Sequence, residues 1–324
     1  MKKALITGGT GYIGHHLQKE LKKNGYYVIV MDRKHPSQLM ATKYCDEYIH
    51  TDIRNYDHIL YEIEYGKMFD DDKFSFDIVF HLAGSIEVGE SEEMPTYYYE
   101  NNVSSTINIL KLMREYDCNK IVFSSSCAAE NPESVYGQTK RMCETILKDA
   151  NKEGVNSAIL RYFNVAGADP DGEFGENHDP ESHLIPRILT LYDFTVYGND
   201  FPTSDGTCIR DYIHVSDLAE AHVKAAEFLN ESKTSSIFNL GSGTGYSVLD
   251  VITVVEEVTG INFKIKYSDR RPGDPAKLVC EDVERSEKIL KFKPKYGLEE
   301  IISTAYRWES IQRRVPNATI GVSD

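Results

Sequence analysis

The chain has 324 residues, of which 41% are hydrophobic, and its 36 basic and 51 acidic side chains give a net charge of −15. This length suits two domains or one large domain with an added lobe, and the hydrophobic share excludes a disordered chain. Proteins that bind a nucleic-acid backbone usually carry a basic face. No cluster of Lys and Arg of that kind is present in the sequence, so we expect no nucleic-acid partner.

The spacing of cysteines and histidines indicates neither disulfides nor a metal site. No two cysteines form a Cys-x-x-Cys motif, and the adjacent His15 and His16 cannot present two ligands on one helix face. We therefore expect reduced thiols, a cytoplasmic protein and no bound metal. The first residues lead directly into an expected strand and contain no apolar region of the kind found in a signal peptide. No apolar run in the sequence reaches the length that spans a bilayer. We therefore expect no membrane association.

In the first half of the chain, short apolar strands alternate with segments of helical spacing. We expect strands at residues 4–7, 27–31, 48–51, 76–80, 120–123 and 157–160. We expect helices at residues 12–23, 95–116 and 135–151, and a further helix at 215–229 followed by a strand at 236–240. Apolar strands separated by helices of about ten residues or more run parallel. The order therefore predicts an α/β fold with a doubly wound parallel sheet of the Rossmann type.

The composition changes halfway along the chain. Residues 165–207 are rich in glycine and proline, which indicates loops, and the chain from Gly241 onward is expected to mix short helices with loops. We therefore predict a Rossmann domain that comprises residues 1–164 plus about 208–240. The remainder, residues 165–207 plus 241–324, would form a smaller and discontinuous α/β lobe.

A glycine-rich turn, Gly8-Gly9-Thr10-Gly11-Tyr12-Ile13-Gly14, joins the first strand to the first helix. Glycines let a pyrophosphate approach the backbone, and the helix N-terminus supplies unpaired N–H groups. Asp32 ends the second strand, where a carboxylate binds the adenosine ribose and repels a 2′-phosphate. These features favour NAD over NADP, although Arg33 weakens the preference. Asp52 and Ile53 follow the third strand and suit the edge of the adenine ring; a helix cap is the alternative role for Asp52.

Tyr136 and Lys140 stand four residues apart in an expected helix, so their side chains share one face. A nearby ammonium and a positive nicotinamide ring both favour the phenolate. We therefore expect the pKa of Tyr136 to lie below its free value of about 10. Such a tyrosine can act as general base toward a sugar hydroxyl, and Ser126, at a strand end, could hydrogen-bond the same hydroxyl. The alternative to a catalytic role is a Tyr–Lys pair on the protein surface. The glycine turn, and the serine at the end of the preceding strand, argue against that alternative.

Over essentially its full length, the chain resembles the nucleotide-sugar 4-epimerases of the extended short-chain dehydrogenase/reductase family, the NAD-dependent epimerases/dehydratases. The most specific stretch runs from Tyr197 to Val215 and is typical of the epimerases rather than of the family at large. The other matching segments are residues 7–14, 52–55, 81–84, 88–91, 101–103, 161–164, 239–241 and 270–274.

The resemblance implies an enzyme that interconverts UDP-glucose and UDP-galactose. Tyr136 would take the proton of the sugar 4-hydroxyl while tightly bound NAD oxidises C4. The 4-keto sugar would then present its other face, and reduction would invert the configuration. The residues that match cofactor positions are Gly8, Gly11, Tyr12, Ile13, Gly14, Asp32, Arg33, Asp52, Ile53, Leu82, Ala83, Gly84, Asn101, Ser124, Tyr136, Lys140 and Phe163. Those that match UDP-sugar positions are Ser126, Tyr136, Asn164, Leu184, Tyr197, Arg210, Arg271 and Asp274.

Arg210 and Arg271 also suit a diphosphate on charge alone, because guanidinium groups bind phosphate oxygens through two parallel hydrogen bonds. An ion pair with one of the many acidic residues is the alternative for each arginine. Leu278 aligns with the position that controls access of N-acetyl sugars in the family, where a Tyr restricts the site. Because Leu is smaller, UDP-N-acetylglucosamine and UDP-N-acetylgalactosamine are additional candidate substrates. Ile86 stands where some epimerases have a lysine near the cofactor.

The segment between Ser126 and Tyr136 departs from the family pattern. Only nine residues separate the two, where the family carries a longer loop over the sugar site, so we expect a more open pocket. An extended chain gains about 3.3 Å per residue, so a segment of this length can still bring the serine and the tyrosine together. The shortened loop is also the one feature that supports a non-catalytic NAD-binding regulator with a degenerate site.

Related activities remain as alternatives. A UDP-uronate or a UDP-pentose 4-epimerase would use the same residues. A 4,6-dehydratase is disfavoured, because Cys127 and Ala128 stand where that enzyme has an Asp-Glu pair. The resemblance also implies a homodimer, in which helices matching about 95–116 and 135–151 form a four-helix bundle between the subunits.

Overall fold

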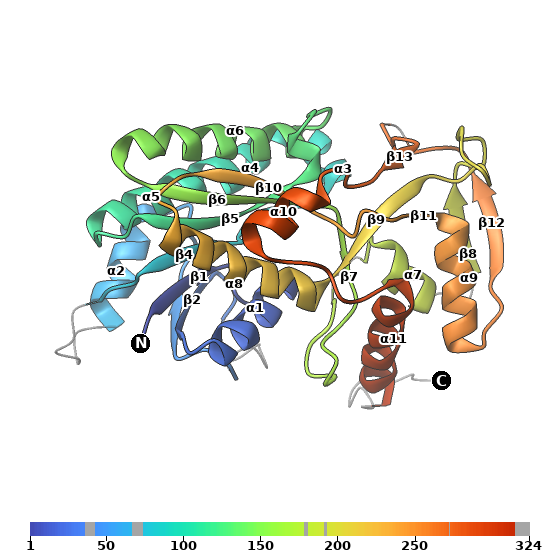
Figure 1. Cartoon of the computed structure of the whole chain (residues 1–324), viewed down its shortest axis with the longest axis horizontal. Coiled ribbons are helices and arrows are strands. Elements are labelled where there is room, and N and C mark those ends of the chain that lie inside the picture. The colour runs from blue at the N-terminus through green and yellow to red at the C-terminus, as the bar shows by residue number, and fades with distance from the viewer. Residues whose placement is uncertain (36–42, 67–73, 178–180, 191–192, 272, 315–324) are drawn as a thin grey trace, which may run out of the picture.

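The computed structural model describes residues 1–35, 43–66, 74–177, 181–190, 193–271 and 273–314. A seven-stranded sheet with helices on both faces fills one side of the molecule, and two smaller sheets with their own helices fill the other (Figure 1). The seven strands lie in the order β10-β6-β5-β4-β1-β2-β3, and all neighbouring strands are parallel. This arrangement confirms the predicted doubly wound sheet.

The strands of the large sheet coincide with the predicted apolar segments. They are β1 (Lys3–Thr7), β2 (Tyr27–Asp32), β3 (Glu47–His50), β4 (Ile78–His81), β5 (Lys120–Ser126), β6 (Asn156–Tyr162) and β10 (Ser236–Leu240). The strand order reverses between β1 and β4, because the chain winds outward from β1 in one direction and from β4 in the other. Doubly wound sheets bind their ligands at such a point, beyond the carboxyl ends of the strands.

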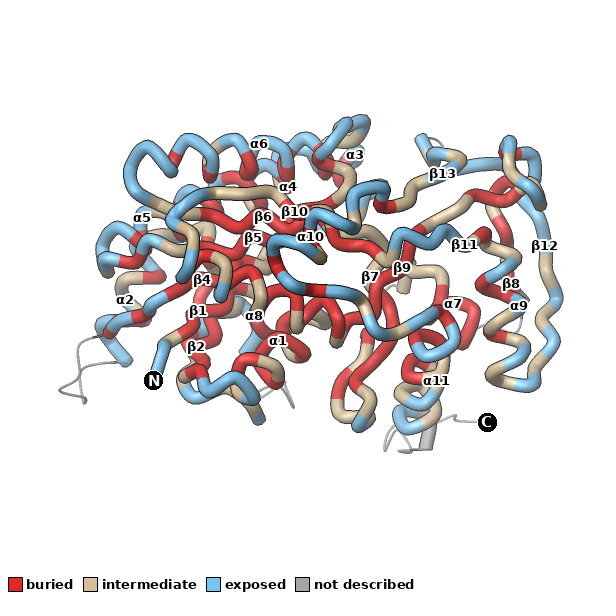
Figure 2. Tube along the Cα trace, viewed as in Figure 1, coloured by how far each residue is buried: buried red, intermediate tan, exposed pale blue. Residues whose placement is uncertain are grey.

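Both faces of the large sheet are buried, which explains why its strands are apolar throughout rather than alternating. In β1, Ala4 and Ile6 belong to the core on one face, whereas Leu5 belongs to the core on the other. The helices are α1 (Tyr12–Lys23) and α8 (Val215–Glu231) on the first face, and α2 (Tyr56–Gly66), α5 (Ser105–Glu115) and α6 (Val135–Ala150) on the second. Figure 2 shows buried strands between helices whose outer sides are exposed.

The other side of the molecule has a separate apolar core, formed by helices packed on two small sheets. One sheet joins β7 (Asn164–Ala166), β9 (Ile209–His214), β11 (Gly245–Ser247) and β13 (Lys277–Leu278), and the other joins β8 (Asp193–Tyr197) and β12 (Lys264–Ser268). The helices are α7 (Leu184–Thr190), α9 (Val248–Thr259) and α11 (Leu298–Arg314), whereas α10 (Val283–Leu290) packs against α8 and β10 and adds Leu290 to the core of the large sheet.

The predicted helix at 95–116 is interrupted. The segment consists of α4 (Pro95–Tyr98), a π-helical stretch (Tyr99–Ser104) and then α5. A π-helical stretch inside a helix is rare and often lies at a functional site, and here it carries Asn101. The remaining helical segments of the described residues are α3 (Val88–Glu93) and the 3₁₀ turns Cys127–Ala129 and Asn151–Glu153.

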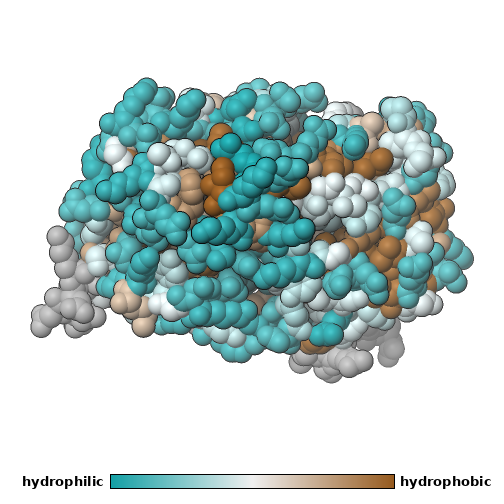
Figure 3. All heavy atoms as spheres, viewed as in Figure 1, coloured by the Kyte–Doolittle hydropathy of each residue, from teal (hydrophilic) through white to brown (hydrophobic). Residues whose placement is uncertain are grey.

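The second half of the chain is more regular than predicted. The glycine-rich stretch 165–207 contains α7 and β8, and the helices after Gly241 include α9 with 12 residues and α11 with 17 residues. Strand β9 pairs with strands of the small sheet, and our division of the chain into two domains stays a prediction. None of the described helices is both long and apolar enough to cross a bilayer. The face in Figure 3 is largely hydrophilic, with apolar residues in its upper middle and on the side of α9 and β12.

Candidate active site

A cavity of about 560 Å³ lies at the carboxyl ends of the large sheet's strands and reaches the small sheets. Its walls come from the ends of β1, β2, β4 and β5 on one side, and from α7, β8 and β9 on the other. This is the point where the strand order reverses, so the fold alone places a ligand site here. Every residue that we predicted for the cofactor or the substrate lines this cavity, with the exception of Ser124.

Two glycines of the turn after β1 have no room for a side chain. Gly8 has a φ of +69°, and a Cβ on it would lie 2.8 Å from the Cα of Ala83 in the turn after β4. A Cβ on Gly14 would lie 2.5 Å from the carbonyl oxygen of Gly8. Gly11 is the N-cap of α1 and brings no side-chain cap, so the first N–H groups of the helix face the cavity without an internal partner. Together these features form a cradle that fits the pyrophosphate of a dinucleotide.

The two aspartates assigned to the adenosine end are both fixed by neighbouring groups. Asp32 Oδ2 accepts hydrogen bonds from the backbone N–H and the hydroxyl of Thr10 (3.1 and 2.7 Å). Asp52 is held by the guanidinium of Arg54, which also lowers the pKa of this carboxyl. The first turn of α2 is capped by Asn55, whose Oδ1 accepts from the N–H of His58 at 3.1 Å. The alternative role of Asp52 as a helix cap is therefore wrong.

The short segment after β5 brings Ser126 and Tyr136 together. It forms one 3₁₀ turn, Cys127–Ala129, and reaches Ser134, which caps α6 by accepting a hydrogen bond from the N–H of Gly137 at 3.1 Å. The side chain of Ser126 lies near enough to the phenol of Tyr136 to lower its pKa, and both residues line the cavity. The geometric part of the prediction, that nine residues suffice, is confirmed.

Helix α3 fixes the start of α6, a contact that we did not predict. The N–H of Tyr136 donates to Ser91 Oγ at 3.1 Å, and the N–H of Val135 donates to a carboxylate oxygen of Glu92 at 2.7 Å. These two N–H groups belong to the first turn of α6, where they lack partners within the helix. The helix is therefore anchored directly beside the tyrosine. The spacing of residues gave no signal for this contact, because α3 and α6 lie far apart in the sequence.

The direction of the Tyr136 pKa shift differs from our prediction. The physical reason is burial, which raises the pKa of Tyr136, while the side chain of Ser126 opposes that shift. The ammonium of Lys140 lies over the ring face, 6.0 Å from the ring centroid, and donates to the carbonyl oxygen of Ser124 at 2.8 Å. A cationic ring bound in the cavity would lower the pKa of the phenol.

Ser124 lies behind the cavity rather than in its wall. Its hydroxyl is hydrogen-bonded to His222 at 3.2 Å, and its carbonyl oxygen holds Lys140. On the opposite wall, Asn101 donates to the hydroxyl of Ser85 at 2.8 Å. A Cβ on Gly84 would lie 3.5 Å from the Lys140 ammonium and 3.0 Å from the amide oxygen of Asn102. Gly84 therefore leaves space that the side chains of Lys140 and Asn102 fill.

The arginines predicted to bind a diphosphate occupy the far end of the cavity. Arg210, on β9, forms an ion pair with Asp274, so the alternative that we considered for this residue exists in the structure. Arg271 stacks on the ring of Tyr197, with its guanidinium carbon 4.4 Å from the ring centroid. All four side chains line the cavity. The pair and the stack each fix one guanidinium group in the cavity wall.

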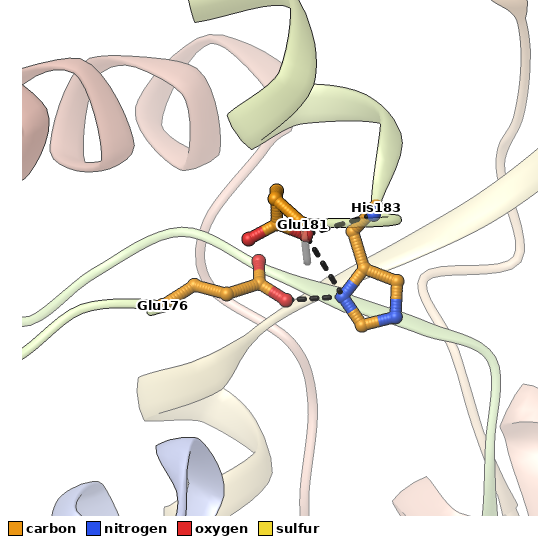
Figure 4. Close-up of side chains that lie close together, drawn as sticks. All are labelled: Glu176, Glu181 and His183. Carbon is orange, nitrogen blue, oxygen red and sulfur yellow. Dashed lines mark hydrogen bonds and ion pairs between the residues drawn. The ribbon is translucent and has the colours of Figure 1, made fainter. Parts of the chain in front are cut away.

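His183 and Glu176 are cavity residues that the sequence analysis missed. Nδ1 of His183 lies in hydrogen-bond contact with Glu176 and 4.0 Å from an oxygen of Glu181 (Figure 4). Ligand atoms of the three residues lie within 4.8 Å of one another. Our expectation of no bound metal stays a prediction, and this cluster is where a metal titration would test it. The signal available in the sequence was the position of His183 directly before Leu184.

The His183 cluster should make stability depend on pH. Burial by itself lowers the pKa of His183, but the hydrogen bond and charge of Glu176 and the charge of Glu181 raise it to about 9. Because this value lies above that of the unfolded chain, protonation favours the folded state. The stabilisation is complete below about pH 6.5 and is lost as the pH rises through about 9. The difference in melting temperature between wild type and His183→Gln should therefore shrink over this range. Glu176→Gln should weaken the same pH dependence; a constant difference would contradict the assignment.

Two further residues that the sequence singled out, Ile86 and Leu278, differ in whether they line the cavity. Ile86 is 42% exposed and forms part of the cavity wall, as a residue near the cofactor should. Leu278 is on β13, opposite Arg210 in the register of β9, and does not belong to the described cavity wall. A role of Leu278 in admitting N-acetyl groups therefore has no direct geometric support, and it stays a prediction.

The fold and the cavity define a Rossmann-type protein with a Tyr, Lys and Ser set beside a dinucleotide cradle. The NAD dependent epimerase/dehydratase family matches residues 4–241. UDP-glucose 4-epimerase of Halalkalibacterium halodurans is 42% identical, covering 94% of both chains. The NAD complex of UDP-glucose 4-epimerase from Brucella ovis has a TM-score of 0.85 at 38% identity, covering 94% of this chain and 98% of that chain. UDP-glucose 4-epimerase from Stenotrophomonas maltophila, with bound NAD and formylated UDP-arabinopyranose, has a TM-score of 0.87 at 31% identity, covering 97% and 99%. The chain belongs to the NAD dependent epimerase/dehydratase family.

Proposed function

We propose that the protein is an NAD-dependent isomerase that interconverts UDP-glucose and UDP-galactose by inverting C4 of the sugar. The observation that carries this proposal is the convergence of Tyr136, Ser126 and Lys140 in one cavity with the glycine cradle and Arg210. The cradle suits a dinucleotide and the arginine suits a diphosphate, so a sugar attached to that diphosphate reaches the tyrosine. The names of the relatives, which are UDP-glucose 4-epimerases, support the same reaction.

The glycine turn would hold NAD, with Asp32 and Asp52 at its adenosine end and Lys140 at its nicotinamide end. Bound NAD supplies an acceptor, and later a donor, for the hydrogen on C4. Asp32 favours NAD over NADP because its carboxylate repels a 2′-phosphate. The guanidinium of Arg33 is turned toward the hydroxyl of Tyr97, to which it donates at 3.2 Å, so it does not neutralise Asp32.

The chain's own residues handle the proton of the 4-hydroxyl. The side chains of Ser126 and Tyr136 lie close together in the cavity wall, so a sugar hydroxyl that enters between them can donate to the tyrosine oxygen while the serine orients it. The buried ammonium of Lys140 is fixed by the carbonyl oxygen of Ser124 and lies over the face of the tyrosine ring. The same tyrosine returns the proton after the keto sugar has turned, so no net proton is consumed.

The direct test is to incubate the purified protein with UDP-galactose and to follow the formation of UDP-glucose. We expect turnover without added NAD, because the cofactor is tightly bound and regenerated in each cycle. UDP-N-acetylgalactosamine and a UDP-pentose should be assayed beside it, since the shortened loop after Ser126 leaves the sugar site less covered. Failure to convert UDP-galactose, in protein that contains NAD, would overturn the proposed reaction.

Arg210 should matter for the diphosphate and not for NAD. We expect Arg210→Ala to raise the KM for UDP-galactose by about tenfold to a hundredfold, since a charge-assisted hydrogen bond contributes about 1.5–3 kcal/mol. The content of bound NAD should not change. The control is Arg285→Ala, which removes an exposed arginine that stacks on Phe238, outside the cavity wall. An unchanged KM, or an equal effect in the control, would contradict the assignment.

We further propose that the protein works in the cytoplasm as a homodimer. The six cysteines are unpaired, which suits a reducing compartment. The outer sides of α5 and α6 carry exposed apolar side chains, among them Ile107 (40% exposed) and Met142 (42% exposed). A second copy could cover them in a bundle of four helices. Light scattering of wild type and of Ile107→Glu would test this: the variant should be monomeric.

A further inference from the structure

A third side chain shares the face of α6 that carries Tyr136 and Lys140. Glu144 follows Lys140 by four residues, so the three side chains lie one above another along the helix. All three are buried, and the side chain of Glu144 is only 3% exposed. The proposed reaction uses the first two and gives no role to the carboxylate. A buried carboxylate is costly unless it is paired, so its contacts identify what it does.

One carboxylate joins the helix to two strands. Glu144 Oε1 accepts from the hydroxyl of Ser125 at 2.6 Å and from Nε of Arg161 at 2.8 Å, and Oε2 accepts from Nη2 of Arg161 at 2.7 Å. Ser125 and Arg161 are register partners on the adjacent strands β5 and β6. The arginine therefore binds through a two-pronged ion pair, a geometry that fixes orientation as well as distance.

The last three residues of β5 are each contacted by a different turn of α6. The carbonyl oxygen of Ser124 accepts from Lys140, the hydroxyl of Ser125 donates to Glu144, and the side chain of Ser126 lies beside the phenol of Tyr136. Two hydrogen bonds and one close approach along one helix face define both the height and the rotation of α6 against the strand. Of the three, the Glu144 attachment is the one that lies away from the cavity.

The same ion pair also reaches the shortened loop. Nη1 of Arg161 lies 3.4 Å from a carboxylate oxygen of Glu130, and Arg141 donates to the carbonyl oxygen of Glu130 at 2.9 Å. Glu130 directly follows the 3₁₀ turn Cys127–Ala129. The segment that departs from the family pattern is therefore held by the arginine that Glu144 holds. A chain with fewer loop residues depends more on such a contact to keep Ser126 in place.

Buried ion pairs contribute little net stability, because the loss of solvation offsets the attraction, so a structural role alone does not explain this arrangement. We propose that Glu144 and Arg161 are positioning residues for the epimerisation, which set Tyr136 and Lys140 of α6 against Ser126 of β5. This inference rests on the proposed function. It predicts that disturbing the pair slows the reaction without weakening the binding of NAD or of the UDP-sugar.

Glu144 also acts on the charge of Lys140. Burial lowers the pKa of Lys140, and the two groups that oppose this shift are Cys143 and Glu144 on the same helix. His81 on β4 lies on the same side of the sheet and feels the charge of Lys140, but burial lowers its own pKa to about 3, so it carries no charge at neutral pH. Loss of the Glu144 charge should therefore let Lys140 lose its proton at a lower pH. The alkaline limb of the pH–rate profile should move downward.

The experiment compares kcat, KM, bound NAD, melting temperature and the pH profile of kcat among variants of the full chain. Glu144→Gln should lower kcat by about tenfold to a hundredfold, the size expected for a displacement of catalytic groups by a fraction of an ångström to about 1 Å. Its KM for UDP-galactose and its NAD content should stay near those of wild type. Arg161→Lys keeps the charge of Glu144 but loses the two-pronged ion pair. Its kcat should therefore fall, while the alkaline limb of its pH–rate profile stays in place.

Two more variants keep the test decisive. Ser125→Ala removes one hydroxyl and should fold even if Glu144→Gln does not; it should lower kcat by a smaller factor with KM unchanged. Asp169→Asn disturbs another buried ion pair, that with Lys19, outside the cavity wall, and should lower the melting temperature while kcat stays at the wild-type level. Equal kcat and equal alkaline limbs in wild type and the folded variants would overturn the inference, as would an equal loss of kcat in Asp169→Asn. An inactive wild type would instead overturn the proposed function.

Discussion

Replacing Tyr136 with Phe should lower kcat for UDP-galactose by about a thousandfold, the middle of the range for loss of a general acid–base group. The ring remains, so packing in its buried position is preserved and only the hydroxyl is removed. Ser126 keeps its own hydroxyl, and the glycine cradle and Arg210 are untouched. Bound NAD and affinity for UDP should therefore be close to those of wild type. The measurement is conversion of UDP-galactose to UDP-glucose, together with the NAD content of the purified protein.

The matched control for this prediction is Tyr26→Phe. Tyr26 is 6% exposed, comparable to Tyr136 at 8%, but it packs in the core beside α1 and lies outside the cavity wall. Its loss should leave kcat unchanged. Turnover by Tyr136→Phe at the wild-type rate would show that another group moves the proton, and the mechanism built on this tyrosine would then be wrong. A fall in NAD content would indicate that the hydroxyl binds the cofactor instead.

The large sheet could be predicted from the sequence because its signals are local. A buried parallel strand is a short apolar run, and a helix that covers it shows a 3.6-residue period, so both appear within a short window. The helices of the second half show the same kind of signal. In α11, Leu298, Ile301, Ile302 and Ala305 recur at helical spacing and are buried. The high content of glycine and proline before this region masked that periodicity, and we predicted only short helices.

The small sheets and the π-helical stretch could not be predicted in the same way. Strand β9 pairs with β7, β11 and β13, and the last two of these contain three residues and two residues. Such short strands have no periodicity of their own and exist only because β9 lies between them. The π-helical stretch Tyr99–Ser104 likewise depends on contacts with residues far away in the sequence. Asn102 accepts a hydrogen bond from the N–H of Ser85 and donates one to the hydroxyl of Thr139.

In the candidate site, too, some residues could be predicted from the sequence and others could not. Residues in recognisable motifs, such as Gly8 and Tyr136, were assigned by number because each motif fixes its own geometry. His183 and Glu144 were missed because their importance comes from partners far away in the sequence. The direction of the Tyr136 pKa shift was also missed, since sequence spacing shows that Lys140 is near but not that the phenol is buried. Burial is a property of the whole fold.

Gly14→Ala should remove most of the bound NAD. The added Cβ would lie 2.5 Å from the carbonyl oxygen of Gly8 and as close to the backbone of Gly9, and neither can turn aside as a flexible side chain could. The turn must therefore shift or the helix must withdraw, and either movement separates the first N–H groups of α1 from the pyrophosphate. Overpacking of this kind costs about 1–3 kcal/mol, which corresponds to an affinity for NAD lower by about tenfold to a hundredfold.

The control for this prediction is Gly66→Ala, since Gly66 ends α2 with nothing within 4 Å of an added Cβ. The variant should bind NAD as wild type does, and its melting temperature should be equal or slightly higher, because alanine restricts the unfolded chain. For Gly14→Ala, activity should return when NAD is added in excess, because Tyr136, Ser126 and Lys140 are unchanged. If the variant purified with a full complement of NAD, the turn after β1 would not be where the pyrophosphate binds. If activity did not return with excess NAD while binding did, the shift would extend beyond the cradle to the catalytic residues.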